Sequence, residues 1–275
     1  MENKSSAIDS GIKEPLFIVK IGGNIIDDPA KLSTFLQELA SVKSKKILIH
    51  GGGKIASQIG EKLGLESNYN SGRRITDDDT LDLVTMVYGG LINKKIVATL
   101  QSQKCNAIGV TGADANLIPA KKRVVKEIDF GWAGDIEAGA IESGNWQLFL
   151  HNNLVPVVAP LTHDGTGNIL NTNADTIASN VAISLSELYE VVLIYCFEKN
   201  GVLENISDDH SVIAFIDQVK YELLLSEKKI AEGMLPKIHN ALSAIDAGVK
   251  KIVIGNAEDL IEIVQGKNKG TTFIK

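Results

Sequence analysis

The chain has 275 residues, of which 44% are hydrophobic and 5% aromatic, so it can bury a large core as one domain or as two lobes. Its formal net charge of -6 argues against a nucleic acid or an anionic membrane as partner, because neither polyanion is attracted to a protein of negative average charge. Local basic pockets are compatible with that average.

The cysteines and the start of the chain point to the cytoplasm. Cys105 and Cys196 lie far apart without metal-ligand spacing, which argues against a disulfide framework or a zinc site and fits a reducing compartment. No apolar run approaches the ~20 residues of a membrane span, and the polar start MENKSSAIDSGIKE does not resemble a signal peptide. We therefore expect a cytoplasmic protein without a membrane partner.

Short runs rich in β-branched residues alternate along the chain with longer amphipathic runs. The predicted strands are Leu16–Ile21, Lys46–His50, Ala107–Val110, Val155–Ala159, Val191–Tyr195 and Lys251–Ile254. The predicted helices are Lys31–Ser41, Lys54–Leu63, a long helix within Asp78–Gln103, Ala174–Leu185 and Pro236–Ala247. Such alternation predicts a parallel α/β sheet with helices on both faces. We expect irregular or hairpin structure in residues 121–150 and a lobe boundary near residues 171–173.

Glycines and lysines gather where predicted strands end or a helix begins. They occur in LFIVKIGG (Leu16–Gly23), ILIHGGGK (Ile47–Lys54) and GMLPKIHNAL (Gly233–Leu242). Bare N–H groups at such turns and at helix N-termini gather phosphate oxygens, and lysines supply charge. The combination predicts a protein that handles a phosphate.

Three phosphate-binding patterns compete for the second glycine turn. Residues 51–56 formally match the dinucleotide fingerprint, but residues 63–75 contain no β run that could supply its second strand. A nucleotide P-loop fails because neither Ser nor Thr follows Gly53-Lys54. A loop whose N–H groups meet a phosphoryl group in flight, with a lysine on a facing strand end, fits the sequence.

Several motifs, taken in order, resemble those of the N-acetyl-L-glutamate kinases in the amino acid kinase family. They are Lys20-x-Gly22-Gly23, His50-Gly51-Gly52-Gly53, Gly72-x-Arg74-Ile75-Thr76-Asp77, Thr111-Gly112-x-Asp114-x-Asn116-Leu117, Asn171-x-Asn173-Ala174-Asp175 and Gly233-Met234-Leu235-Pro236-Lys237. The resemblance covers nearly all of Leu16–Ile274. The broader family shares the glycine turns and the lysine, whereas the Arg-Ile-Thr-Asp and Asn-x-Asn-Ala-Asp stretches point to the acylglutamate enzymes.

The resemblance implies a three-layer αβα sandwich with a mainly parallel central sheet. Residues 15–172 would form an N-terminal lobe for acylglutamate binding and dimerisation, residues 173–275 a C-terminal lobe for ATP, and residues 1–14 a flexible tail. The implied reaction transfers the γ-phosphoryl group of ATP to the side-chain carboxylate of N-acetyl-L-glutamate, a step of arginine biosynthesis. Mg²⁺ would arrive chelated by ATP, since the sequence shows no carboxylate cluster for a dedicated cage.

The implied residue types suit this chemistry, because a carboxylate is already ionised at neutral pH and the main obstacle is repulsion between two anions. By resemblance, Lys20 and Lys237 flank the transferred phosphoryl group, and Asp175 orients both lysines. Asp175 also suits a helix N-terminus, and the two roles are compatible. Backbone N–H groups would come from Gly22, Gly23, Gly52 and Gly53, and the last two would also contact the substrate.

Substrate binding calls for a fork of donors, which arginine offers to a carboxylate. Arg74 matches the family position, while Arg73 stands where the family is commonly apolar and could be a solvated loop charge. Asn171 would bond the α-amido part of the substrate, with a turn-forming asparagine as the alternative. His50, His151 and His163 are expected to be structural, because the reaction needs no proton shuttle.

One segment departs from the family pattern. Residues 195–201 form a longer stretch than the usual Thr-Asp or Thr-Asn followed by a tight glycine turn. By resemblance this stretch lies near the nucleotide base and ribose. The candidates for nucleotide contacts are Tyr195, Cys196, Phe197 and Lys229.

Other functions remain open. N-succinyl-L-glutamate would use the same catalytic residues and differ only in the pocket around the amide. A kinase of the same fold could act on another small acid, and a sensing protein without catalysis would have little reason to keep Lys20, Asp175 and Lys237 together.

Assembly and regulation are also open to prediction. Arginine-inhibited members of the family link dimers into a hexamer through a long N-terminal helix. Here about fifteen residues precede the first strand, with too few apolar residues for a stable amphipathic helix. We expect a homodimer formed largely through the long helix within Asp78–Gln103, and insensitivity to arginine.

Overall fold

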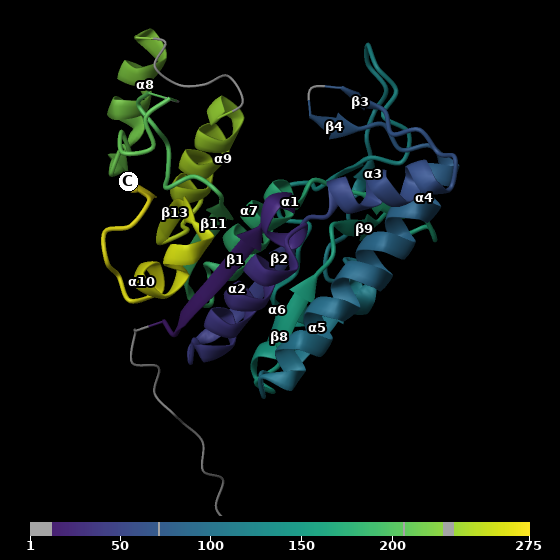
Figure 1. Ribbon diagram of the computed structural model, residues 1–275, viewed down its shortest axis with the longest axis horizontal. Helices are drawn as coiled ribbons and strands as arrows, with labels where there is room; N and C mark the ends of the chain where they lie inside the picture. Colours follow the sequence, from purple (N-terminus) through teal and green to yellow (C-terminus); the bar gives the residue numbers. More distant parts are fainter. Residues whose placement is uncertain (1–12, 71, 206, 228–233) are drawn as a thin grey trace, which may run out of the picture.

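The computed structural model describes residues 13–70, 72–205, 207–227 and 234–275. At its centre lies an eight-stranded sheet (Figure 1). The strand order is β12 (Phe215–Ile216), β14 (Thr271–Phe273), β13 (Lys251–Asn256), β11 (Glu190–Phe197), β1 (Pro15–Ile21), β2 (Lys45–His50), β8 (Val155–Val158) and β5 (Ala107–Val110). Neighbouring strands are parallel except β13 and β14. The predicted mainly parallel sheet is therefore confirmed.

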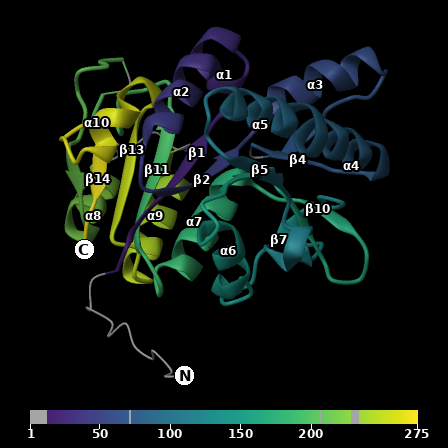
Figure 2. The same ribbon diagram turned by 90° about the horizontal axis from the view of Figure 1, so that it is seen from below.

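Helices cover both faces of this sheet, which gives the predicted three layers (Figure 2). One face carries α1 (Gly23–Ile26), α2 (Pro29–Ser41), α3 (Gly53–Lys62), α4 (Asp78–Val84), α5 (Asn93–Ser102) and α10 (Leu260–Val264). The other face carries α6 (Ser143–Leu150), α7 (Ala174–Leu185) and α9 (Leu235–Asp246). Helix α8 (Gln218–Ser226) packs against β12, and the described part of the chain includes the short 3₁₀ turns η2 (Asp114–Asn116) and η4 (Ala257–Asp259).

Burial on both faces explains why β1 is a continuous apolar run. Leu16 and Ile18 belong to the core beneath α7 and α9, whereas Phe17 and Val19 belong to the core beneath α2 and α5. Successive side chains of a strand point to opposite faces, so a strand covered twice needs an apolar residue at every position. Lys20 breaks this run near the carboxyl end of the strand, which marks it as a site residue.

Residues 78–102 form one long helix, as predicted, in which the π-helical turn η1 (Thr85–Ile92) joins α4 to α5. Asp77 caps its start by accepting a hydrogen bond from the Thr80 N–H. Of the described residues, this helix of 25 residues is long and apolar enough to cross a membrane by length and composition. No uninterrupted apolar run in this helix approaches ~20 residues, because Asp82 and Lys94 interrupt the pattern, and the helix reaches that character only as an average over its length. In its most apolar window, 44% of the residues are buried inside the protein.

The elements that differ from prediction are short or inserted. In residues 121–150 the expected hairpin is β6 (Lys121–Lys122) with β7 (Gly134–Asp135), but helix α6 follows it. The expectation of no β run in residues 63–75 is wrong, because β3 (Tyr69–Asn70) and β4 (Arg73–Arg74) form a minimal hairpin there. Strands β12 and β14 and the hairpin of β9 (Leu161–His163) with β10 (Ile169–Asn171) are also unpredicted. Such short strands give too little alternation for a sequence signal.

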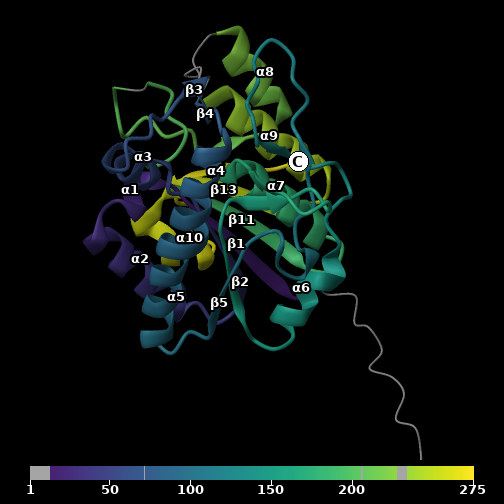
Figure 3. The ribbon, with the colours of Figure 1, turned by 90° about the vertical axis from the view of Figure 1, so that its right-hand side faces the viewer.

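The β3–β4 hairpin and helix α8 lie beyond the carboxyl ends of the central strands. Figures 1 and 3 place the β3–β4 hairpin and helix α8 beyond the end of the sheet at which β1 and β2 finish. In a parallel α/β sheet, this end is where ligands bind.

Candidate active site

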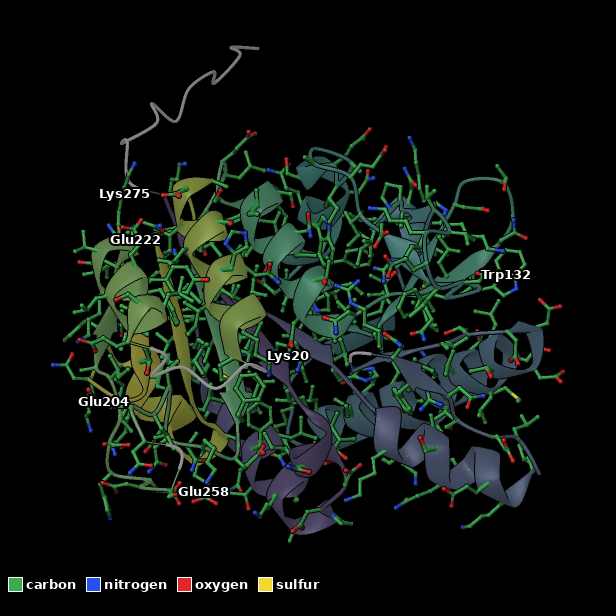
Figure 4. The ribbon with its side chains drawn as sticks, turned by 90° about the horizontal axis from the view of Figure 1, so that it is seen from above. Lys20, Trp132, Glu204, Glu222, Glu258 and Lys275 are labelled. Atoms are coloured by element: carbon green, nitrogen blue, oxygen red, sulfur yellow. The ribbon has the colours of Figure 1, made fainter. Side chains whose placement is uncertain are left out.

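A cleft opens at the carboxyl ends of β1 and β2. Its cavity volume is about 240 Å³, and its walls include Lys20 and Asp175 at one end and Arg74 and Asn171 at the other. Figure 4 shows Lys20 near the middle of the molecule, where the N-terminal and C-terminal halves meet. The cleft thus gathers residues from motifs that are far apart in the sequence.

Asp175 lies between two lysines. The distance from Lys20 Nζ to Asp175 Oδ1 is 2.7 Å, and the distance from Lys237 Nζ to Asp175 Oδ2 is 4.0 Å. Asn173 caps helix α7 by accepting hydrogen bonds from the N–H groups of Asp175 and Thr176. Asp175 therefore stands in the first turn of α7, where the helix dipole favours a carboxylate. The structure brings together the three residues to which the sequence analysis gives catalytic roles.

These charges influence one another strongly because they are shielded from water. Burial alone would raise the pKa of Asp175, but the charges of Lys20 and Lys237 hold that pKa below its ordinary value. Burial lowers the pKa of Lys237, and the charge of Lys20 lowers it further, against the opposite effect of Asp175. The group thus sets one carboxylate between two lysine side chains, so basic groups outnumber acidic groups at the site.

The glycine turns bring backbone close to this charge group. Gly22 and Gly23 follow β1, and a Cβ atom on Gly22 would lie 3.8 Å from Lys20 Nζ. Gly52 precedes α3 with a φ of +150°, and a Cβ atom there would lie 2.3 Å from Ile92 Cδ1. Only glycine fits that position without strain and a clash. Gly53 begins α3 at the cleft, so the first N–H groups of this helix are available to an anion.

Arg74 is buried in the wall of the cleft and already has protein partners. Its Nη1 donates to Ser67 Oγ (2.6 Å), and its Nη2 donates to Gly53 O (2.8 Å), to Ser57 Oγ (2.9 Å) and to the Tyr69 hydroxyl. Its Nε has no hydrogen-bond partner within the described part of the chain. A bidentate bond to a carboxylate therefore stays a prediction, and it requires the guanidinium group to exchange some of these partners.

Asn171 ends β10 on the opposite side of the cleft. Its side-chain N–H donates to Thr76 Oγ1 (3.0 Å), and its backbone N–H donates to Trp132 O (2.8 Å). These bonds connect β10 to the residues that follow β4 and to the inserted hairpin. Asn171 is thereby held facing the cleft to which the sequence analysis assigned it.

The cleft also contains residues that the sequence analysis did not select. Arg123 lines it beside Arg73, and its Nε donates to both carboxylate oxygens of Asp135, at 3.1 and 3.0 Å. Tyr69 and Tyr88 line it near Gly53. The π-helical turn that contributes Tyr88 has no sequence signature, although such turns are frequent at functional sites.

The candidates for nucleotide contacts occupy different environments. The side chains of Tyr195 and Cys196 are buried in the sheet, and burial raises the pKa of the Cys196 thiol to about 12. Phe197 is partly exposed, and its ring faces Lys20 and Lys237. Lys229 and Gly233 lie outside the described residues. Nucleotide binding by these residues stays a prediction.

His50 has a structural environment. It is fully buried, its Nδ1 lies 2.7 Å from Gly51 O, and its Nε2 lies 3.3 Å from Asn93 Nδ2. Burial lowers its pKa to about 4, so the imidazole is neutral at neutral pH. Among the described residues, no group of three or more His, Cys, Asp or Glu side chains could hold a metal ion.

Comparison with known proteins agrees with this geometry. A model of the amino acid kinase family matches residues 15–256. The chain belongs to the amino acid kinase family. Within this family it is 51% identical over 263 residues to the acetylglutamate kinase of Cytophaga hutchinsonii, and the matched residues cover 95% of this chain and 99% of the relative. It is 49% identical over 243 residues to the acetylglutamate kinase of Bacteroides fragilis, which covers 88% of this chain and 92% of the relative. The resemblance inferred from the motifs is thus confirmed.

Solved structures show the same fold at low sequence identity. N-acetylglutamate synthase from Neisseria gonorrhoeae, complexed with coenzyme A and N-acetyl-glutamate, has a TM-score of 0.79 and 19% identity, over 96% of this amino acid kinase and 60% of that chain. Carbamate kinase from Giardia lamblia, bound to AMP-PNP, has a TM-score of 0.65 and 16% identity, over 97% and 99% of the two chains. At such identities the likeness concerns the fold alone.

Proposed function

We propose that this protein is an N-acetyl-L-glutamate kinase, which transfers the γ-phosphoryl group of ATP to the side-chain carboxylate of N-acetyl-L-glutamate in arginine biosynthesis. The observation that carries the proposal is the group of Lys20, Asp175 and Lys237 next to the glycine turns, of which Lys20 and Asp175 line one cleft with Arg74 and Asn171. The relatives named acetylglutamate kinase at about half identity support it.

The reaction needs charge and position rather than a base. An oxygen of the substrate carboxylate attacks the γ-phosphorus, the bond from that phosphorus to the β–γ bridging oxygen breaks, and the products are ADP and an acyl phosphate. Negative charge grows on the bridging oxygen and spreads over the transferred group. Lys20 and Lys237 stabilise this charge. Asp175 holds both lysines, before the nucleotide binds, near the position that the γ-phosphorus will occupy.

The lobes divide the two substrates. Residues 15–172 bind N-acetyl-L-glutamate, with Arg74 at a carboxylate and Asn171 at the amide. Residues 173–275 bind ATP. The N–H groups of Gly22, Gly23, Gly52 and Gly53 bind the phosphoryl oxygens, where a backbone without Cβ atoms allows close approach.

Magnesium belongs to this proposal as a companion of ATP. It would supply positive charge to the β- and γ-phosphates. The described residues provide no cluster of acidic side chains that would hold it by themselves. Asp175, the acidic residue of the site, is already paired with Lys20.

A coupled assay of ADP release with N-acetyl-L-glutamate, N-succinyl-L-glutamate, free glutamate, carbamate and aspartate tests the proposed function. Turnover should require an N-acylated glutamate. Turnover with carbamate, aspartate or free glutamate in place of the acylated substrate would contradict it, as would the absence of ADP release with every acid.

A second candidate substrate is N-succinyl-L-glutamate, and the charges beside Arg74 favour considering it. Arg73 and Arg123 both line the cleft, while Asp135 neutralises one of them. One positive charge is thus left near the acyl end of the cleft, where the carboxylate of a succinyl group would be attracted. If Arg73→Ala and Arg123→Ala both weaken binding of the succinyl substrate without affecting the acetyl substrate, these arginines bind the succinyl carboxylate. A wild-type kcat/KM higher for the succinyl substrate than for the acetyl substrate would show that the succinyl compound is preferred.

We further propose a homodimer, formed through the long helix of residues 78–102, and a cytoplasmic location. On this helix Met86 and Leu91 are exposed by 59% and 38% although both are large and apolar. Such side chains on one helix support an interface with a second copy of the chain.

A further inference from the structure

Phe197 is in contact with both lysines of the site. Its ring centroid lies 3.9 Å from Lys237 Nζ and 5.2 Å from Lys20 Nζ. The face of an aromatic ring carries partial negative charge and attracts a cation within about 6 Å of the centroid. A single ring therefore interacts with both ammonium groups that surround Asp175.

Strand pairing and the neighbouring ring of Tyr195 hold the ring of Phe197 in place. Phe197 is the last residue of β11 and pairs with Asn256 of β13. Its ring stacks on that of Tyr195, with centroids 6.4 Å apart and an interplanar angle of 17°. The Tyr195 hydroxyl lies 2.6 Å from Ser179 Oγ and donates to Asp175 O at 3.2 Å. Tyr195, which supports the ring, is thus hydrogen-bonded to Asp175, the residue that pairs with Lys20.

Lys237 has the greater need of this contact. It stands in the first turn of the 12-residue helix α9, where the positive end of the helix dipole repels an ammonium ion. Asp175 lies 4.0 Å away from it and is engaged more closely by Lys20, at 2.7 Å. The ring of Phe197, at 3.9 Å, is therefore as near to Lys237 as its carboxylate partner is.

We propose that Phe197 is a positioning residue that holds Lys237 and Lys20 in their catalytic arrangement through the face of its ring. This inference rests on the proposed kinase function. The ring does not touch the reacting atoms. It keeps two mutually repelling ammonium groups close to Asp175, so that both are in place when the phosphoryl group moves.

Phenylalanine analogues with one, two and three fluorine atoms test the electronic role at nearly constant size. Fluorine withdraws charge from the ring face, so kcat should fall stepwise with each fluorine, to roughly a tenth for the trifluoro ring. The KM for N-acetyl-L-glutamate should stay unchanged. The same analogues at Phe215, which is 49% exposed in β12, should leave kcat unchanged. Equal kcat for all rings at position 197 would overturn the inference.

Substitutions and spectra separate this inference from the proposed function. Phe197→Leu should lower kcat by about tenfold, whereas Phe197→Trp, which keeps an aromatic face, should retain most of the wild-type kcat. In NMR spectra of the ¹³Cε-lysine-labelled protein without substrate, the Lys237 signal should be ring-shifted and should lose that shift in Phe197→Leu. A Lys237 signal without a ring shift overturns the inference even in an active enzyme. A ring-shifted Lys237 in a wild-type protein that turns over no acylglutamate supports the contact and contradicts the proposed function.

Discussion

Lys20 Nζ lies 2.7 Å from Asp175 Oδ1, and this ion pair connects the end of β1 to the first turn of α7. Only 8% of the Lys20 side chain and 19% of the Asp175 side chain are exposed. Two elements from opposite halves of the chain therefore meet at one charge pair, which positions the lysine before any substrate binds. The pair links the stability of the fold to the chemistry of the site.

Removing either lysine should stop phosphoryl transfer. We expect Lys20→Ala and Lys237→Ala each to lower kcat by at least about a hundredfold, the effect of losing a preorganised transition-state donor. Steady-state kinetics at saturating ATP measure this effect. Lys45→Ala is the matched control, since Lys45 pairs with Glu14 at the opposite end of the central sheet. Near-normal turnover in either site variant would refute the catalytic role.

Asp175→Asn should change how stability depends on pH. The pKa of Asp175 lies below its ordinary value of 3.8, so its charge stabilises the folded chain above that pH and loses this effect as the pH falls through the lower, folded-state pKa. The variant should unfold more easily at neutral pH, by roughly 3 kcal/mol, because Lys20 is left buried and unpaired. The difference from wild type should shrink below pH ~4.

Urea unfolding over a pH series measures this difference in free energy of unfolding. Glu190→Gln is the control, because Glu190 forms an exposed pair with Lys250 at 3.8 Å and should contribute little at any pH. If the difference in free energy of unfolding between wild type and Asp175→Asn stayed constant down to the lowest pH, the lysine partners would not be stabilising the charged form of the carboxylate.

Arg74→Lys should impair substrate binding selectively. A lysine cannot replace the forked donors that reach Ser67, Ser57 and Gly53, so the KM for N-acetyl-L-glutamate should rise by about tenfold or more while the KM for ATP stays nearly constant. Arg73→Lys should have a much smaller effect on the same KM. A larger effect from Arg73 would mean that the alignment of this loop with the family is shifted by one residue.

The sequence allowed prediction of the parts of the site that follow directly from long buried strands. Lys20 and the first glycine turn stand at the end of an apolar run, and parallel topology brings the ends of such runs together. Asp175 was assigned by its place in the Asn-x-Asn-Ala-Asp motif of the family, and the structure agrees by setting it in the first turn of α7, two residues after the N-cap Asn173. These positions depend on local patterns that each chain segment carries by itself.

Other parts of the site depend on contacts between distant segments. Arg123 reaches the cleft only because the β6–β7 hairpin packs beside β3–β4, and neither hairpin is long enough to show alternation. The ring of Phe197 meets two lysines because β11 continues past Tyr195, which pairs with Lys20, to the same end of the sheet. No periodicity in the sequence reports either approach.

The proposed dimer predicts a defined effect of charge on the long helix. Met86 and Leu91 expose large apolar side chains there, so Met86→Glu with Leu91→Glu should place uncompensated charges in the interface and yield monomers. Light scattering should give about twice the 29.5 kDa chain mass for wild type and a single chain mass for the double variant. Val219→Glu, on a 76% exposed site of α8, should remain dimeric. Circular dichroism must show intact helices in the double variant, since both residues face away from the core. A monomeric wild type would contradict the dimer, and a folded double variant that stays dimeric would place the interface elsewhere.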